Sequence, residues 1–176
     1  MVEIKNFFEN YLKKESIFLD KKTLFPSYIP EEIIYREEQL QEVANILAPA
    51  LRMEKPSNLF IYGKTGTGKT ISVKHVLLSM HKVAIQNNVA LKFIYINCKL
   101  KKVADTEYRL IAQLVKEFGQ EIPSTGLPTD EVYNVFYKLL DQKKQIILLV
   151  LDEVDQLTKK IGDEILYNLT RINSEL

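Results

Sequence analysis

The feature that most constrains the fold is a glycine-rich stretch, FIYGKTGTGKT, at residues 60–70. It satisfies the pattern G-x-x-x-x-G-K-[ST] with Gly63, Gly68, Lys69 and Thr70. The stretch continues an apolar run, SNLFIYG, which is typical of a strand buried on both faces. A helix is predicted to follow from Thr70. A buried strand, a glycine loop and a helix in this order predict a phosphate-binding loop.

Each part of the loop has a chemical role. Glycines permit positive φ and carry no Cβ atom to block close approach of the backbone. Successive N–H groups, helped by the helix N-terminus, can then bind phosphate oxygens. Lys69 supplies a mobile positive charge for the β- and γ-phosphates, and Thr70 offers a hydroxyl to Mg²⁺. We expect nucleotide contacts from the whole loop: Gly63, Lys64, Thr65, Gly66, Thr67, Gly68, Lys69, Thr70 and Ile71.

An acidic motif, IILLVLDEVD, supplies the second half of the predicted site. Six apolar residues in a row are typical of a central parallel strand, which here ends at Asp152. That carboxylate can hold Mg²⁺, usually through a water, while Glu153 orients or deprotonates the attacking water. We therefore expect Glu153 and Lys69 to be catalytic, and Thr70 and Asp152 to be the metal ligands. Asp155 either belongs to the site or begins the next helix.

The rest of the chain alternates between helical and strand patterns. Two further strands are expected, at residues 91–96 and 146–151, in addition to the one before the loop. Helices are predicted at residues 1–15, from Glu31 to the region of Pro49, from Thr70, from a cap at Asp105 to Gly119, from Thr129 or Asp130, and from about Asp163. This alternation predicts an α/β fold, with a parallel sheet flanked by helices. The first helix could pack on the body or on a partner.

Composition and charge exclude several classes of function. The chain has 176 residues, 46% hydrophobic and 27% charged, and a formal net charge of only +1. No overall basic field argues for nucleic acid, so any such binding must come from a local patch. No apolar run approaches the roughly 18 residues of a membrane span, and the N-terminus has no apolar signal core. A single cysteine, Cys98, fits a reducing interior. We expect a cytoplasmic protein with no membrane partner.

Several stretches together resemble the AAA+ core of archaeal replication initiators of the origin-recognition-complex (ORC) type. They are LFPSYIPEEIIYREEQLQEVANILAPAL, PSNLFIYGKTGTGKT, TGLPTDEVY, LVLDEVD and LYNLTRINSEL. The resemblance implies a P-loop ATPase domain of the AAA+ class at residues 18–176, preceded by an amphipathic segment at residues 1–17. It also implies binding of ATP or ADP with Mg²⁺, and slow ATP hydrolysis that acts as a switch. The implied partners are double-stranded origin DNA, other initiator subunits and the replicative helicase.

Two segments carry further roles by the same resemblance. YIPEEIIYRE matches the region that closes over the adenine, which implies base contacts by Ile29, Pro30 and Arg36. Plain packing is the alternative for Ile29 and Pro30. Residues 105–142 correspond to a helical insertion by which these initiators touch DNA. Its charges are of mixed sign, as on a solvated surface, and the basic residues in and just after it are Arg109, Lys116, Lys138, Lys143 and Lys144.

The resemblance stops after TRINSEL. There the family continues into a strand that carries a nucleotide sensor and lies between the glycine-loop strand and the Asp152 strand. We expect a gap in the sheet at this point, with unpaired backbone groups. The lid, the arginine finger and the winged-helix domain of the family also have no match. We interpret the chain as a fragment that is poorly stable alone and hydrolyses ATP weakly or not at all.

Two other functions compete with the initiator hypothesis. TGTGKT with DEVD also fits a DExD-type helicase or translocase, but residues 73–97 contain no further helicase motif that we can identify. The third hypothesis is a module that binds nucleotide without hydrolysing it. The effect of Glu153→Gln on turnover distinguishes this module from an ATPase.

Overall fold

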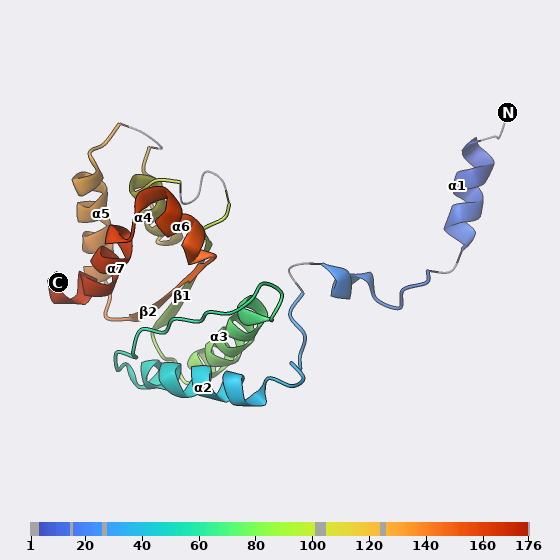
Figure 1. Cartoon of the computed structure of the whole chain (residues 1–176), viewed down its shortest axis with the longest axis horizontal. Helices are drawn as coiled ribbons and strands as arrows, with labels where there is room; N and C mark the ends of the chain where they lie inside the picture. Colours follow the sequence, from blue (N-terminus) through green and yellow to red (C-terminus); the bar gives the residue numbers. More distant parts are fainter. Residues whose placement is uncertain (1–3, 15, 26–27, 101–104, 124–125, 176) are drawn as a thin grey trace. The chain divides into compact units, whose positions relative to one another are not determined.

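The computed structural model describes residues 4–14, 16–25, 28–100, 105–123 and 126–175 (Figure 1). Residues 1–3 and 15 of the predicted first helix and residues 124–125 of the predicted insertion lie outside this part. The chain divides into two units, Met1–Ile33 and Ile34–Leu176, which are described separately. The domain boundary expected between residues 17 and 18 stays a prediction.

The first unit contains two short helical segments. α1 (Ile4–Lys13) confirms the predicted amphipathic helix. η1 (Lys21–Leu24) is a 3-10 turn whose first residues are capped by Asp20, since the Asp20 carboxylate accepts the N–H of Lys22 at 2.8 Å. The large apolar side chains of α1 are all exposed: Ile4, Phe7, Phe8, Tyr11 and Leu12. Packing of this helix on the body or on a partner stays a prediction.

The second unit is built on two parallel strands with helices on both faces (Figure 1). The strands are β1 (Leu91–Asn97) and β2 (Ile146–Asp152). The helices are α2 (Glu37–Leu47), η2 (Ala48–Arg52), α3 (Lys69–Gln86), α4 (Glu107–Glu117), α5 (Thr129–Asp141), α6 (Val154–Ile161) and α7 (Glu164–Glu175). This arrangement confirms the predicted α/β class, with both strands where the sequence predicts them.

Strand register determines which residues meet. β1 and β2 run in parallel, with Leu91 opposite Ile146 and Asn97 opposite Asp152. The carboxyl ends of both strands therefore lie at the same edge of the sheet. There the N–H of Cys98 extends the ladder by donating to the carbonyl of Asp152 at 2.9 Å. Because side chains alternate between faces, Asp152 lies on the same face of the sheet as Leu148 and Val150 of β2.

Two apolar clusters cover the two faces of the sheet. α2, η2 and α3 pack on one face, where the buried residues are Val43, Ala50, Val76, Leu77, Met80 and Leu148. α4 to α7 pack on the other, over Ile94 and Ile96 of β1. In α4, Leu110, Ile111 and Leu114 are fully buried, and each contributes about 1.5–3 kcal/mol through burial. The helices on both faces explain why the strands are nearly continuous apolar runs.

The prediction of a strand before the glycine loop is wrong. Residues 57–62 are not assigned to any strand, and no backbone hydrogen bond joins them to the rest of the described chain. Leu59, Phe60, Ile61 and Tyr62 are exposed to between 37% and 83%. A strand needs a neighbour to satisfy its N–H and C=O groups, and none of the described segments lies beside this one as a strand. This agrees with the gap expected between the glycine loop and β2.

Three helix boundaries can be compared with their predicted caps. α2 begins at Glu37 rather than Glu31, and the acidic first turn consists of Glu37 and Glu38. The cap of α4 is Thr106, not Asp105, because the Thr106 hydroxyl accepts the N–H of Arg109 at 3.2 Å. The start of α5 at Thr129 is confirmed.

Candidate functional site

The glycine loop leads directly into the N-terminus of α3. Gly68 is the N-cap residue of α3 and has φ of +83°, a left-handed conformation that L side chains rarely adopt. The first N–H to close a helical turn belongs to Ser72 and donates to the carbonyl of Gly68 at 3.0 Å. The N–H groups of Lys69, Thr70 and Ile71 precede that bond, so they belong to the donors that a helix leaves for a cap or a ligand. These donors and the positive end of the helix favour an anion at this position.

The Lys69 side chain folds back over the loop. Its ammonium group donates to the carbonyls of Gly63 and Lys64, both at 2.8 Å. The Thr67 hydroxyl donates to the same Lys64 carbonyl at 2.8 Å. The loop is thus closed around a positive charge, next to the N-terminus of α3. Phosphate oxygens that entered the loop would meet this ammonium group and the backbone donors together.

Thr70 and Asp152 lie in contact, although they are 82 positions apart in the chain. The Thr70 hydroxyl lies 3.1 Å from Asp152 Oδ1 and 3.0 Å from Oδ2. Oδ1 also accepts the N–H of Glu153 at 3.1 Å, and Oδ2 accepts the Tyr95 hydroxyl at 2.5 Å. Donors from three segments therefore fix one carboxylate beside the glycine loop.

This donor set fits Mg²⁺. The ion prefers oxygen ligands and typically binds through one or two carboxylates together with substrate phosphates and water. Thr70 and Asp152 supply a hydroxyl and a carboxylate in contact at the mouth of the phosphate loop. Among the described residues, no group of three or more His, Cys, Asp or Glu side chains could hold a metal by itself. A Mg²⁺ ion here would therefore depend on oxygens from a bound nucleotide and from water.

Two groups near Asp152 have raised pKa values. Burial, together with the hydrogen bond and the negative charge of Asp152, raises the pKa of the Tyr95 phenol above its ordinary value. Burial, with a smaller contribution from the charge of Asp152, raises the pKa of the Cys98 thiol to about 11. Both groups therefore stay protonated at neutral pH. Tyr95 is then a hydrogen-bond donor to Asp152 at every physiological pH, and Cys98 is a neutral buried side chain.

Glu153 is placed differently from its neighbour. Its backbone is left-handed, with φ of +56°, and it is the N-cap residue of α6. Such a conformation is uncommon for a residue with a Cβ atom, and strained backbone of this kind gathers at functional sites. The side chain is exposed. Asp155 lies in the first turn of α6, where Lys159 pairs with it at 3.0 Å and lowers the pKa of its carboxyl group.

The residues predicted to contact adenine fall in two different units. Arg36 precedes α2 in the second unit, and its guanidinium donates to the carbonyl of Thr67 in the glycine loop. It therefore contacts the loop itself. Ile29 and Pro30 are half-buried in the first unit, and their contact with a base stays a prediction.

The predicted insertion forms a helical hairpin, since α4 and α5 pack together over the sheet. Its cation Arg109 pairs with Asp105 at 3.5 Å, and Lys160 of α6 reaches the same carboxylate at 2.6 Å. No ion pair is found for Lys116 or Lys138 among the described residues. The hairpin therefore presents some cations that no carboxylate of the described chain neutralises.

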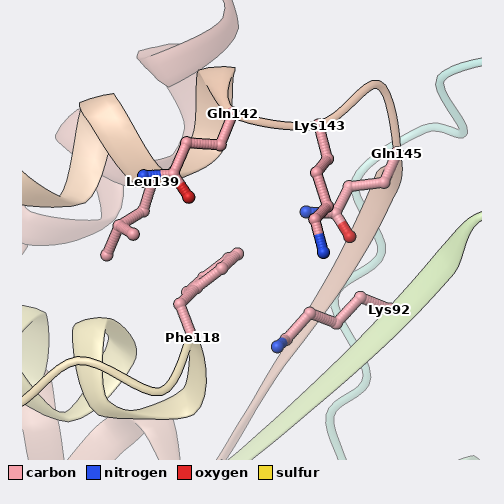
Figure 2. Close-up of a pocket in the computed structure, with 6 residues that line it drawn as sticks. All are labelled: Lys92, Phe118, Leu139, Gln142, Lys143 and Gln145. Atoms are coloured by element: carbon pink, nitrogen blue, oxygen red, sulfur yellow. The ribbon is translucent and has the colours of Figure 1, made fainter.

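One hollow lies between the first residues of the two strands and the ends of α4 and α5 (Figure 2). It has a cavity volume of about 110 Å³. Its lining residues are Lys92, Phe118, Leu139, Gln142, Lys143 and Gln145. Lys92 lies near the start of β1, and Gln145 immediately precedes β2, whereas Asp152 ends β2. This hollow is therefore separate from the candidate nucleotide site.

Sequence reasoning did not single out Tyr95, the side chain that contacts Asp152 most closely. The sequence offered one signal: β1 and β2 both end in polar residues, Asn97 and Asp152, and Tyr95 lies two positions before Asn97. Only the register of β1 against β2 shows that these ends meet. Arg36 was singled out for a different contact, with the adenine.

Comparisons with known proteins place these features in context. A family model described as an AAA domain matches residues 52–175. The ORC1-type DNA replication protein of Thermococcus onnurineus (strain NA1) is 47% identical over 177 residues, which cover 98% of this chain and 42% of that protein. The protein of the same name from Pyrococcus abyssi is 46% identical over 179 residues, covering 99% of this chain and 42% of that protein. The chain thus spans about two fifths of the length of these relatives.

Solved structures agree with the sequence matches. The Aeropyrum pernix ORC1 protein in complex with DNA matches with a TM-score of 0.85 and 42% identity, covering 93% of this chain and 42% of that chain. The Aeropyrum pernix ORC2 protein, in ADPNP–ADP complexes, matches with a TM-score of 0.72 at 24% identity, covering 90% of this chain and 41% of that chain. At this lower identity the second likeness shows the fold alone. The resemblance stated from the sequence is confirmed by these comparisons.

Proposed function

The chain belongs to the AAA domain family, and from this premise we propose that it is the nucleotide-binding part of an ORC1-type replication initiator. In this proposal it binds ATP or ADP with Mg²⁺, and nucleotide state governs its association with origin DNA. Its further partners are other initiator subunits and the replicative helicase, and it acts in the cytoplasm. Within the described chain, no helix is long and apolar enough to cross a bilayer.

The observation that carries the proposal is the contact between Thr70 and Asp152, at 3.0 Å. It joins the end of the glycine loop to the end of β2, the two places where the sequence predicts metal ligands. Two motifs that lie 82 positions apart in the sequence thus meet at one contact. An ordinary glycine turn would not require an acidic strand end beside it.

The residues present can divide the work of phosphoryl transfer. The loop N–H groups and Lys69 bind and orient the phosphates, and Thr70 and Asp152 hold Mg²⁺. The ion, when bound, neutralises charge that develops on the transferred phosphoryl group. Glu153, exposed at the start of α6, orients the attacking water or takes its proton. Arg36 stabilises the loop through the Thr67 carbonyl.

DNA binding is proposed for the α4–α5 hairpin. The support is the match to the Aeropyrum pernix ORC1 protein, whose structure was solved in complex with DNA, together with the cations on the hairpin. Phosphate contacts of this kind supply affinity that falls with salt and carries no sequence information. None of the relatives named above is a helicase, so the comparisons favour the initiator hypothesis.

We expect the triple variant Arg109→Gln, Lys116→Gln and Lys138→Gln to bind a fluorescent A/T-rich 30-base-pair duplex about 10-fold or more weakly at low salt. The slope of log affinity against log salt should become shallower by about one for each phosphate contact that is lost. Fluorescence anisotropy at several salt concentrations measures both. The matched control neutralises Lys22, Lys55 and Lys82, which lie outside the hairpin. Equal weakening in both triple variants, or none in either, would exclude the hairpin as the DNA contact.

A further inference from the structure

The Asp152 carboxylate is held by a side chain that belongs to neither the glycine loop nor the acidic motif. Its Oδ2 atom accepts the hydroxyl of Tyr95 at 2.5 Å, shorter than either distance to the Thr70 hydroxyl. Hydrogen bonds to ionised acceptors are shorter and roughly twice as strong as neutral ones. The tyrosine is thus the closest hydrogen-bonding partner of the predicted metal ligand.

Strand register brings this tyrosine to the carboxylate. Tyr95 lies opposite Val150 and Asn97 lies opposite Asp152. Tyr95 and Asp152 therefore lie two positions apart along the pair and on one face of the sheet, and the Tyr95 side chain spans this separation to reach Oδ2. Tyr95 shares this face with Phe93, which packs against the α2–α3 layer. The phenol consequently points towards the carboxyl edge, where the phosphate loop lies.

Helix α3 holds the other side of the ring. The Lys74 ammonium group lies over the Tyr95 ring, 4.4 Å from its centroid, an attractive cation–π arrangement. Lys74 is four positions after Thr70, so both side chains project from the same face of α3. One face of the helix thus contacts both Asp152, through Thr70, and Tyr95, through Lys74.

We propose that Tyr95 is a positioning residue that holds the Asp152 carboxylate in the orientation in which it and Thr70 bind Mg²⁺. This inference rests on the proposed function. Partners that orient a metal ligand typically change metal affinity by 10- to 100-fold when they are removed. Tyr95 does not reach the phosphates in this proposal, so its hydroxyl should matter for the metal and not for the nucleotide alone.

The test measures the affinity of a fluorescent ADP derivative with Mg²⁺ and again with EDTA. In the unaltered chain, Mg²⁺ should tighten binding. In Tyr95→Phe, we expect that tightening to fall by about 10-fold or more, with the affinity in EDTA unchanged within about 2-fold. A merely structural role would weaken binding equally in the two conditions. Far-UV circular dichroism checks that the variant is folded.

Tyr133→Phe is a matched control. Tyr133 is also a partly buried tyrosine that donates to a carboxylate, that of Glu107 at 2.6 Å, but it lies in the α4–α7 layer. Removing its hydroxyl costs a similar bond and should leave the Mg²⁺ effect intact.

A second measurement uses the unaltered chain with ¹³Cζ-labelled tyrosine. The Tyr95 resonance, assigned from the backbone, should shift when Mg²⁺ is added to the ADP complex.

The outcomes separate the two proposals. If Tyr95→Phe keeps the full effect of Mg²⁺, or the Tyr95 resonance does not respond to the ion, the positioning role is wrong and the proposed function stands. If the unaltered chain binds ADP no more tightly with Mg²⁺ than with EDTA, both the metal site and the positioning role are wrong. If the unaltered chain binds no nucleotide in either condition, the proposed function itself fails.

Discussion

Replacing Lys69 by alanine is expected to weaken ADP binding about 100-fold. Among the described residues, Lys69 is the one charged residue of the glycine loop whose side chain donates hydrogen bonds to the loop's own carbonyls. Charge-assisted hydrogen bonds to phosphate are among the strong ones, worth about 1.5–3 kcal/mol each. Losing about 2.7 kcal/mol corresponds to two decades of affinity. Equilibrium titration with a fluorescent ADP derivative measures the change.

The control for this variant is Lys64→Ala, which removes the same charge from the same loop. The Lys64 side chain is exposed, and the loop uses its carbonyl rather than its ammonium group. We expect its affinity to stay within about 5-fold of the unaltered chain, since a single exposed charge contributes up to about 1 kcal/mol. Equal losses in the two variants would mean that only the net charge of the loop matters, and that Lys69 has no special role.

Glu153→Gln is expected to slow ATP hydrolysis at least about 100-fold while leaving nucleotide affinity within about 2-fold. General base catalysis typically contributes 10²–10⁴ in rate, and glutamine keeps the size of the side chain but cannot take a proton. Because the Glu153 side chain is exposed and its N–H bond to Asp152 comes from the backbone, the substitution leaves the carboxylate of Asp152 in place. Single-turnover assays with radiolabelled ATP resolve slow rates.

Asp155→Asn is the matched control for Glu153. It removes a neighbouring exposed carboxylate whose partner is Lys159, and it should leave turnover within about 2-fold. If the unaltered chain shows no hydrolysis above the buffer rate, the alternative of a module that only binds nucleotide is favoured. If Glu153→Gln hydrolyses ATP as fast as the unaltered chain, Glu153 is not the base.

Local patterns predicted most of the second unit. The β-branched and aromatic run of β1 and the apolar run of β2 specify strands that need cover on both faces, and both formed where expected. The helix after the glycine loop begins at Lys69, one position before the predicted start, because Gly68 supplies the left-handed turn. The contact between Thr70 and Asp152 agrees with the prediction that these two residues are the metal ligands of one site.

The features that the sequence did not predict correctly have a common physical cause. Residues 57–62 have the composition of a buried strand, but strand formation depends on a partner that local sequence does not describe. Similarly, Tyr95 looked like an ordinary strand residue, because its contact with Asp152 depends on register across 57 positions of sequence. Arg36 contacts Thr67 of the loop, although 31 positions of sequence separate the two residues. Composition and periodicity describe local preferences, whereas such distant pairings follow only from the fold.

The proposed function requires that the glycine loop, Lys69, Thr70 and Asp152 form one nucleotide site. Isothermal titration of ADP into the chain in the presence of Mg²⁺ measures whether such a site exists. We predict saturable binding of one ADP per chain, weakened about 100-fold in Lys69→Ala and to the Mg²⁺-free affinity in Asp152→Asn. Absence of saturable binding, or binding of unchanged affinity in both variants, would contradict it.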